Sequence, residues 1–215
     1  DRILQMAKER TASARGWEFT IIGNFDEATI RPLICQYLGA LPAKANNVAS
    51  KRMNKMAVGQ IENIFHRKME TPKADANMVW FSEDIPYTTE NAIKASIAGQ
   101  ILSMVYIKKI REDASAAYTC GASGSASIDD KDHNVTLFAY CPMKPEKADL
   151  ALQIMRDEVT NLSKQCDASM LAKVKEYMVK EADNEAKTNG YWAGVISTWY
   201  RYGIDLHTDY KALVA

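Results

Sequence analysis

The sequence predicts an α+β fold, a two-layer sandwich in which helices pack on one face of a mostly antiparallel sheet. Segments with strand character alternate with segments that have helical periodicity. Two strand segments follow each other across a short polar turn, as in a hairpin. Hydrophobic residues make up 47% of the 215 residues and charged residues 25%, which is the composition of a globular domain. The order along the chain is β-α, β-β, α, β-β, α, α, which suits such a sandwich.

The first elements are a helix, a strand and a second helix. Residues 2–14 have a helical pattern, and residues 17–22 are rich in aromatic and β-branched side chains, which predicts a strand. A turn follows, in which Asp26 is placed to cap the next helix, and Gly39 ends that helix. Its apolar stripe consists of Ile30, Leu33, Ile34, Tyr37 and Leu38.

Two further strands and a long helix are predicted next. Residues 43–57 are polar and unpatterned, and we interpret them as a connector within one domain. Residues 60–69 and 77–81 predict strands, and residues 86–90 begin the long helix. The apolar stripe of this helix is followed by a basic last turn, where cations interact favourably with the helix dipole. The residues of the stripe and the end are Ile93, Ile97, Ile101, Val105, Lys108 and Lys109.

A hairpin and two helices complete the chain. The hairpin has arms at about residues 116–128 and 135–141, with the turn at 129–134. Pro145 suits the first turn of the next helix, and Asp167 can cap a further one. That helix is interrupted at Asn189-Gly190, resumes its spacing at Tyr191 and ends at Gly203.

The cysteines form no zinc-ribbon motif. None of the 4 cysteines lies in a C-x-x-C pair, which excludes that kind of site. Cys120 and Cys141 are approximate cross-strand partners in the predicted hairpin. We expect all four to be reduced, because a domain of this size needs no disulfide to fold. They are Cys35, Cys120, Cys141 and Cys166.

Charge and hydropathy exclude two classes of partner. Lys plus Arg is 27 and Asp plus Glu is 27, and no basic stripe is present, so the chain is not expected to bind nucleic acid. No run approaches the roughly 18 apolar residues of a membrane-spanning helix. Because Asp1 is not a natural start and a helical pattern begins at Arg2, we expect residues 1–215 to be one domain of a longer chain.

The motifs of peptide-bond hydrolysis are missing. His66, His133 and His207 are the 3 histidines, and none belongs to H-x-x-E-H or H-E-x-x-H, whose spacing places two imidazoles on one helix face. No G-x-S-x-G elbow is present, and the acidic turn at 129–132 lacks the spacing of a Ca²⁺ loop. The sequence therefore predicts no catalytic residue and no metal ligand in this chain.

Three segments of the chain together form a recognisable pattern. They are 19–26 with 37–42, Ile110-Arg111-Glu112 with Tyr118 seven residues after the arginine, and 171–176 with 189–192. Their order and spacing extend over nearly the whole chain. Together they resemble one family, the pitrilysin/insulinase-type zinc peptidases, and within it a C-type domain from the second, non-zinc half. The subfamily they resemble most is the large bacterial peptidases of the coenzyme-PQQ-linked type.

The resemblance implies a role for two residues. In this family two halves close around a chamber, and the first half holds zinc through H-x-x-E-H and a distant Glu. The second half supplies no metal ligand and helps to bind the peptide, through an arginine and a tyrosine that reach toward the substrate. The positions that match are Arg111 and Tyr118. The family often has Gly-Leu before this tyrosine, where the present chain has Ala116-Ala117, which keeps a small residue at the turn.

Strand alternation predicts a different orientation for the tyrosine. It places Tyr118 on the same face as Cys120 and Ala122, which would point Tyr118 into the core. A strand end or a β-bulge would redirect the side chain.

The resemblance implies a peptide substrate, a zinc-bearing half of the same protein as partner, zinc only in that half, and a bacterial periplasm or cell envelope as location. Two alternatives remain open. The chain could be an inactive structural or assembly half of a peptidase-like complex, or an unrelated α+β domain that binds a small ligand.

Overall fold

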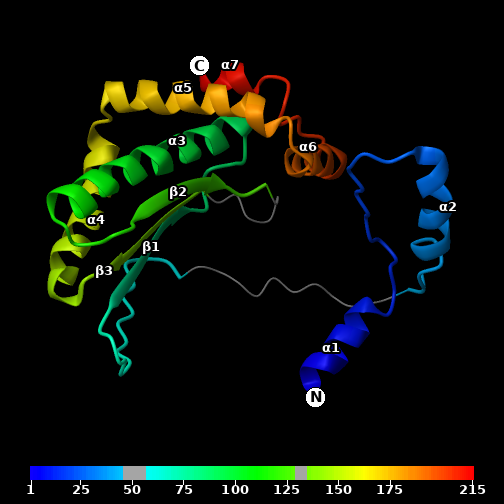
Figure 1. The fold of residues 1–215 in the computed structure, drawn as a ribbon, viewed down its shortest axis with the longest axis horizontal. Helices are drawn as coiled ribbons and strands as arrows, with labels where there is room; N and C mark the ends of the chain where they lie inside the picture. The colour runs from blue at the N-terminus through cyan, green and yellow to red at the C-terminus, as the bar shows by residue number, and fades with distance from the viewer. Residues whose placement is uncertain (46–56, 129–134) are drawn as a thin grey trace. The chain divides into compact units, whose positions relative to one another are not determined.

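The computed structural model describes residues 1–45, 57–128 and 135–215. The chain divides into two compact units, residues 1–66 and 67–215 (Figure 1). The predicted hairpin turn at 129–134 and most of the predicted connector at 43–57 lie outside the described residues. The assignment of residues 1–215 to one domain stays a prediction.

The first unit contains two helices, α1 (Arg2–Thr11) and α2 (Glu27–Tyr37). The predicted cap of α2 is confirmed, because the backbone N–H of Thr29 donates to Oδ2 of Asp26 at 2.8 Å. Hydrogen bonds from the side chain and the backbone of Thr29 lower the pKa of Asp26.

The two strands predicted at 17–22 and 60–69 are wrong, because neither segment forms a strand. Both have β-type composition, and Trp17, Phe19 and Ile21 do alternate along the first of them. A strand also needs a neighbour that supplies its ladder of hydrogen bonds. The described residues of the first unit provide no such neighbour.

The second unit is built on a three-stranded antiparallel sheet. Its strands are β1 (Ala74–Ser82), β2 (Gly121–Ala126) and β3 (Val135–Met143), in the spatial order β1-β3-β2. The predicted hairpin is therefore confirmed as β2 and β3, and the strand predicted at 77–81 is confirmed as the longer β1.

The helices of this unit also follow the prediction closely. Thr88 and Asp167 cap α3 and α5 through side-chain oxygens, and Gly203 ends α6 in the left-handed conformation, with φ of 68°. The structure adds a short final helix that the sequence did not predict, α7. The helical elements are α3 (Thr89–Tyr106), the π-helix η1 (Ile107–Asp113), the 3₁₀-helix η2 (Pro145–Lys147), α4 (Ala148–Lys164), α5 (Ala168–Glu185), α6 (Asn189–Tyr202) and α7 (Tyr210–Val214).

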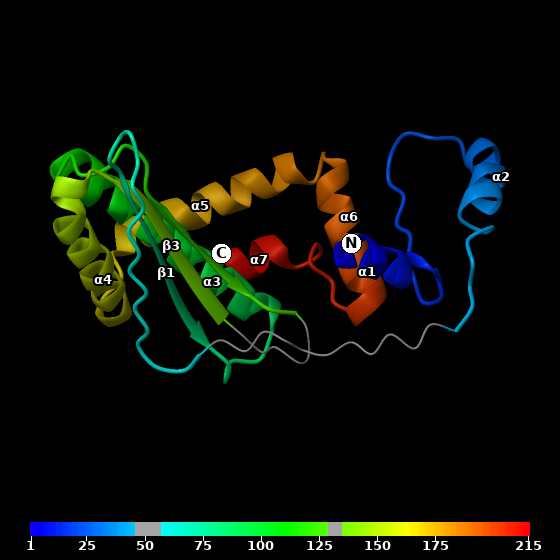
Figure 2. The same ribbon diagram turned by 90° about the horizontal axis from the view of Figure 1, so that it is seen from below.

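Helices cover one face of the sheet, as predicted for an α+β sandwich (Figures 1 and 2). On the covered face, Ala139 and Cys141 of β3 are fully buried among side chains of α3 and α4. On the other face, Phe138 and Tyr140 of β3 are partly exposed. A second cluster of buried side chains joins α3 to α5 and α7, and Val214 of α7 is its most buried member. No helix among the described residues is long and apolar enough to cross a membrane.

Candidate functional site

The long helix α3 continues without a break into the π-helix η1. Ile110 is fully buried in the core under η1, whereas Arg111 on the next position is exposed. π-helical turns are rare and occur often at functional sites. The widened turn thus fixes Ile110 inside and directs Arg111 toward solvent.

A tight turn follows η1 and is held by backbone hydrogen bonds. The N–H of Ala114 donates to the carbonyl of Lys109 at 3.0 Å, and the N–H of Ala116 donates to the carbonyl of Ile110 at 2.8 Å. Ser115 between them has φ of 50°, a left-handed conformation that costs a non-glycine residue about 1 kcal/mol or more. The chain therefore reverses direction within a few residues of Arg111.

The two alanines before Tyr118 are anchored to the start of the next helix. Ala116 is fully buried, and its carbonyl accepts from the N–H of Lys144 at 3.0 Å. The ammonium of Lys147 donates to the carbonyl of Ala114 at 2.5 Å. The turn is therefore formed with Ala116-Ala117 in place of the Gly-Leu that the resembled family often has before this tyrosine, as expected for a small residue at this position.

Tyr118 begins a β-bulge. Ala117 lies opposite Met143, and Gly121 lies opposite Tyr140. Residues 118–120 on one side therefore face only residues 141 and 142 on the other. One extra residue of this kind bends the strand and redirects its side chains.

The bulge decides the orientation of the tyrosine. Tyr118 is 81% exposed, whereas Cys120, two residues later, is 5% exposed. The inward orientation predicted from strict alternation is therefore wrong, because the regular strand begins only at Gly121.

Arg111 and Tyr118 lie together at this end of the sheet. Cζ of Arg111 is 5.2 Å from the centre of the Tyr118 ring, which is a cation–π contact. Both side chains are exposed. Within the part of the chain that the structure describes, neither has a hydrogen-bond partner, so the phenol O–H and the guanidinium N–H groups are available to a ligand.

Two buried thiols have raised pKa values. Cys120 and Cys141 are buried and free. Burial raises the pKa of Cys120, and the nearby Arg111 opposes this only partly. Burial, with smaller effects of Cys120 and Asp75, raises the pKa of Cys141 to about 11.

The described residues contain no group of three or more His, Cys, Asp or Glu side chains arranged to hold a metal ion. His66 is exposed, and Nδ1 of His207 shares a hydrogen bond of 2.7 Å with the Tyr191 hydroxyl. His133 lies outside the described residues. Among the residues that the structure describes, no set of side chains is arranged to fit a zinc site.

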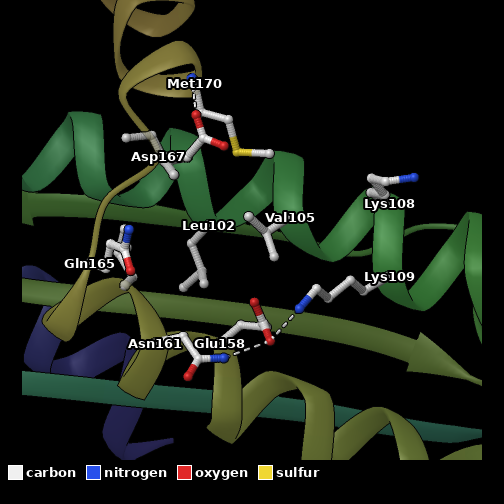
Figure 3. A pocket seen from close by; sticks show the side chains of 11 residues that line it. Leu102, Val105, Lys108, Lys109, Glu158, Asn161, Gln165, Asp167 and Met170 are labelled. Atoms are coloured by element: carbon white, nitrogen blue, oxygen red, sulfur yellow. Dashed lines mark hydrogen bonds and ion pairs between the residues drawn. The ribbon is translucent and has the colours of Figure 1, made fainter.

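A pocket of about 290 Å³ lies among α3, α4 and the start of α5 (Figure 3). Its walls are mostly apolar, and its polar groups include Lys108 and Lys109 from η1 and Glu158 and Asn161 from α4. The sequence singled out the two lysines only as a basic helix end. Nothing in the local pattern around Glu158 indicated the pocket, because its walls come from three separate helices.

The sequence matches a family model described as the Peptidase M16 inactive domain over residues 13–178. No curated protein matches the chain significantly.

Several solved structures share the fold. The periplasmic protease PqqL from Escherichia coli superposes with a TM-score of 0.66 at 19% identity, over 89% of this chain and 21% of that one. The ferredoxin protease FusC, in complex with Arabidopsis ferredoxin, gives 0.62 at 17% identity, over 90% and 21%. A protease from Helicobacter pylori gives 0.58 at 12% identity, over 90% and 47%. The chain thus spans about a fifth of the length of the first two proteases.

Proposed function

This chain belongs to the peptidase M16 family, in which it matches the inactive domain, and we propose that it binds the peptide substrate of a zinc-dependent endopeptidase without hydrolysing it. Because the chain belongs to this family, the alternative of an unrelated α+β domain that binds a small ligand is excluded. The observation that carries the proposal is the exposed pair of Arg111 and Tyr118, whose donor groups have no protein acceptor among the described residues.

The pair suits recognition of a peptide backbone. A peptide carbonyl oxygen accepts hydrogen bonds, and the phenol and the guanidinium can each donate one to it. The π-helix, the left-handed turn at Ser115 and the bulge at Tyr118 together position both residues. Donors that are already in position need little reorganisation when negative charge develops on the oxygen.

On this proposal, hydrolysis itself belongs to a zinc-bearing half of the parent protein that is not part of this chain. The similarity to proteases supports a peptide or protein as substrate. One of these structures contains a bound ferredoxin, and another is described as periplasmic. We therefore propose that this chain is located in the periplasm or cell envelope of a bacterium.

The test replaces Tyr118 by phenylalanine in the full-length enzyme. Turnover should fall roughly 10²-fold, the loss seen when one oxyanion donor is removed. The melting temperature should stay unchanged, because the hydroxyl of an exposed side chain contributes little to stability. Tyr200→Phe is the matched control, since Tyr200 is also largely exposed but lies on α6.

Two outcomes would contradict the proposal. Normal turnover with a lowered melting temperature would identify Tyr118 as a packing residue. Normal turnover with normal stability would favour the alternative of a structural or assembly half.

A further inference from the structure

The pocket among α3, α4 and α5 contains an ion pair in mostly apolar surroundings. Nζ of Lys109 lies 2.7 Å from Oε1 of Glu158, and Nδ2 of Asn161 donates to the same oxygen at 3.0 Å. The Glu158 side chain is only 11% exposed. Because the Lys109 side chain is 47% exposed, this pair adds little net stability.

The second oxygen of Glu158 is available to a ligand. In Figure 3 it points from α4 toward Leu102 and Val105 of α3, into the pocket. No described residue donates to it. A carboxylate oxygen that is largely withdrawn from solvent gains free energy when it accepts a hydrogen bond, so an N–H or O–H donor is the complementary group.

Positive charge lies at the η1 end of the same pocket. Lys108 is paired with Asp113 at 3.6 Å, but both side chains are about 60% exposed, and such surface pairs are weak. Lys109 is 47% exposed and carries three N–H donors, of which Glu158 uses one. The Lys109 ammonium lies beside the apolar walls, and the Lys108 ammonium lies at the exposed rim, directed away from them in Figure 3 on a stem that can rotate. Positive charge beside apolar walls favours a ligand that combines an apolar body with a carboxylate.

From these groups we infer that the pocket binds the C-terminal residue of a peptide, with an apolar side chain. One such residue carries all three complementary groups on a single Cα. Its N–H donates to the free oxygen of Glu158, its carboxylate meets Lys108 and Lys109, and its side chain packs on Leu102 and Val105. The volume of about 290 Å³ lies at the small end of ligand pockets, which suits one residue rather than a long segment. This inference does not depend on the proposed role of Arg111 and Tyr118.

The test titrates the purified chain with acetyl-alanyl-leucine and follows backbone amide signals by NMR. Binding with Kd of about 1 mM is expected for a ligand of this size, with shifts confined to the pocket residues. The C-terminal amide of the same dipeptide should bind at least about tenfold more weakly, because it lacks the carboxylate. The free acid 4-methylpentanoate, which has the side chain and carboxylate but no N–H, should also bind more weakly.

Variants localise the binding. Lys108→Gln and Glu158→Gln should each weaken it about tenfold, and Val105→Trp should abolish it by filling the pocket. Lys94→Gln is the matched control, because Lys94 is an exposed, ion-paired lysine at the other end of α3. Lys108→Gln sits on the surface and tests the idea even if Val105→Trp fails to fold.

Four results would overturn the inference. They are an amide that binds as well as the acid, shifts that fall outside the pocket, no binding at all, and equal binding of 4-methylpentanoate, which would reject the peptide terminus as occupant. None of these results bears on the Tyr118→Phe test of the proposed function.

Discussion

Gly99 of α3 and Gly124 of β2 meet where the helix crosses the sheet, and neither position has room for a side chain. A Cβ on Gly99 would collide with the backbone of Ser123 and Gly124, and one on Gly124 would collide with the carbonyl of Ala95. Two glycines thus allow α3 to lie directly against β2. Since α3 continues into η1, this contact also sets the position of Arg111.

Replacing Gly99 by alanine should destabilise the fold. The added methyl group meets backbone atoms that cannot rotate away, and overpacking of this kind costs about 1–3 kcal/mol. This exceeds the gain of about 1 kcal/mol that alanine brings to a helix interior. Urea unfolding of the purified variant measures the difference in the free energy of unfolding.

Gly194→Ala in α6 is the control for the same exchange. Nothing lies within 4 Å of a Cβ at Gly194, so only helix propensity changes, and stability should rise by up to about 1 kcal/mol. Equal effects of the two substitutions would mean that the contact between α3 and β2 is looser than described.

Local interactions made much of the helical layer predictable. Asp26 and Asp167 are read correctly as caps because the carboxylate and the N–H groups it binds are two or three residues apart. The strands predicted at 17–22 and 60–69 fail because pairing depends on a neighbour that the segment itself does not encode.

The candidate site also combines features that the sequence predicted with features that depend on distant parts of the chain. The family resemblance singled out Arg111 and Tyr118 as two residues that reach toward the substrate. The π-helix and the bulge that expose Tyr118 depend on register and packing, which no short sequence pattern specifies. The contact of Lys109 with Glu158 joins residues 49 positions apart, so no short sequence pattern could predict it either.

Removal of the guanidinium at Arg111 should impair substrate binding and spare the fold. In the full-length enzyme, Arg111→Ala is expected to lower kcat/KM by about 10- to 100-fold, the loss for a charged hydrogen-bond donor. The exposed cation–π contact contributes only about 0.5–1 kcal/mol, so the melting temperature should change little. Steady-state kinetics and thermal unfolding measure the two effects.

A second cation–π pair in the chain provides the control for Arg111. Cζ of Arg201 lies 5.9 Å from the ring of Tyr202 on α6. Arg201→Ala should leave kcat/KM unchanged. A loss of activity equal to that of Arg111→Ala would show that the effect is not specific to the proposed site.

The isolated chain is expected to bind no stoichiometric zinc and to cleave no peptide. The histidines that the structure describes, His66 and His207, take no part in any grouping of three or more metal-ligating side chains there. Zinc requires several N or S ligands together. Elemental analysis after dialysis should find far less than one zinc per chain, and about one tightly held zinc would refute the prediction.

The final prediction concerns the thiols and their dependence on pH. Titration of the denatured, unreduced chain should find four thiols, and finding two would show that Cys120 and Cys141 are bonded. In the folded chain Cys35 and Cys166 are exposed and should react quickly, whereas Cys120 and Cys141 should react slowly because they are buried and hold little thiolate.

The pKa of Cys141 is raised from 9.0 to about 11, so this thiol ionises in the unfolded chain before it does so in the folded one. Its contribution to stability is therefore complete below about pH 9 and is lost as pH rises toward 11. Cys141→Ser should show a smaller decline, because a hydroxyl does not titrate in this range and only Cys120, whose pKa is also raised by burial, still contributes. Urea unfolding at pH 8 and pH 10 compares the two chains.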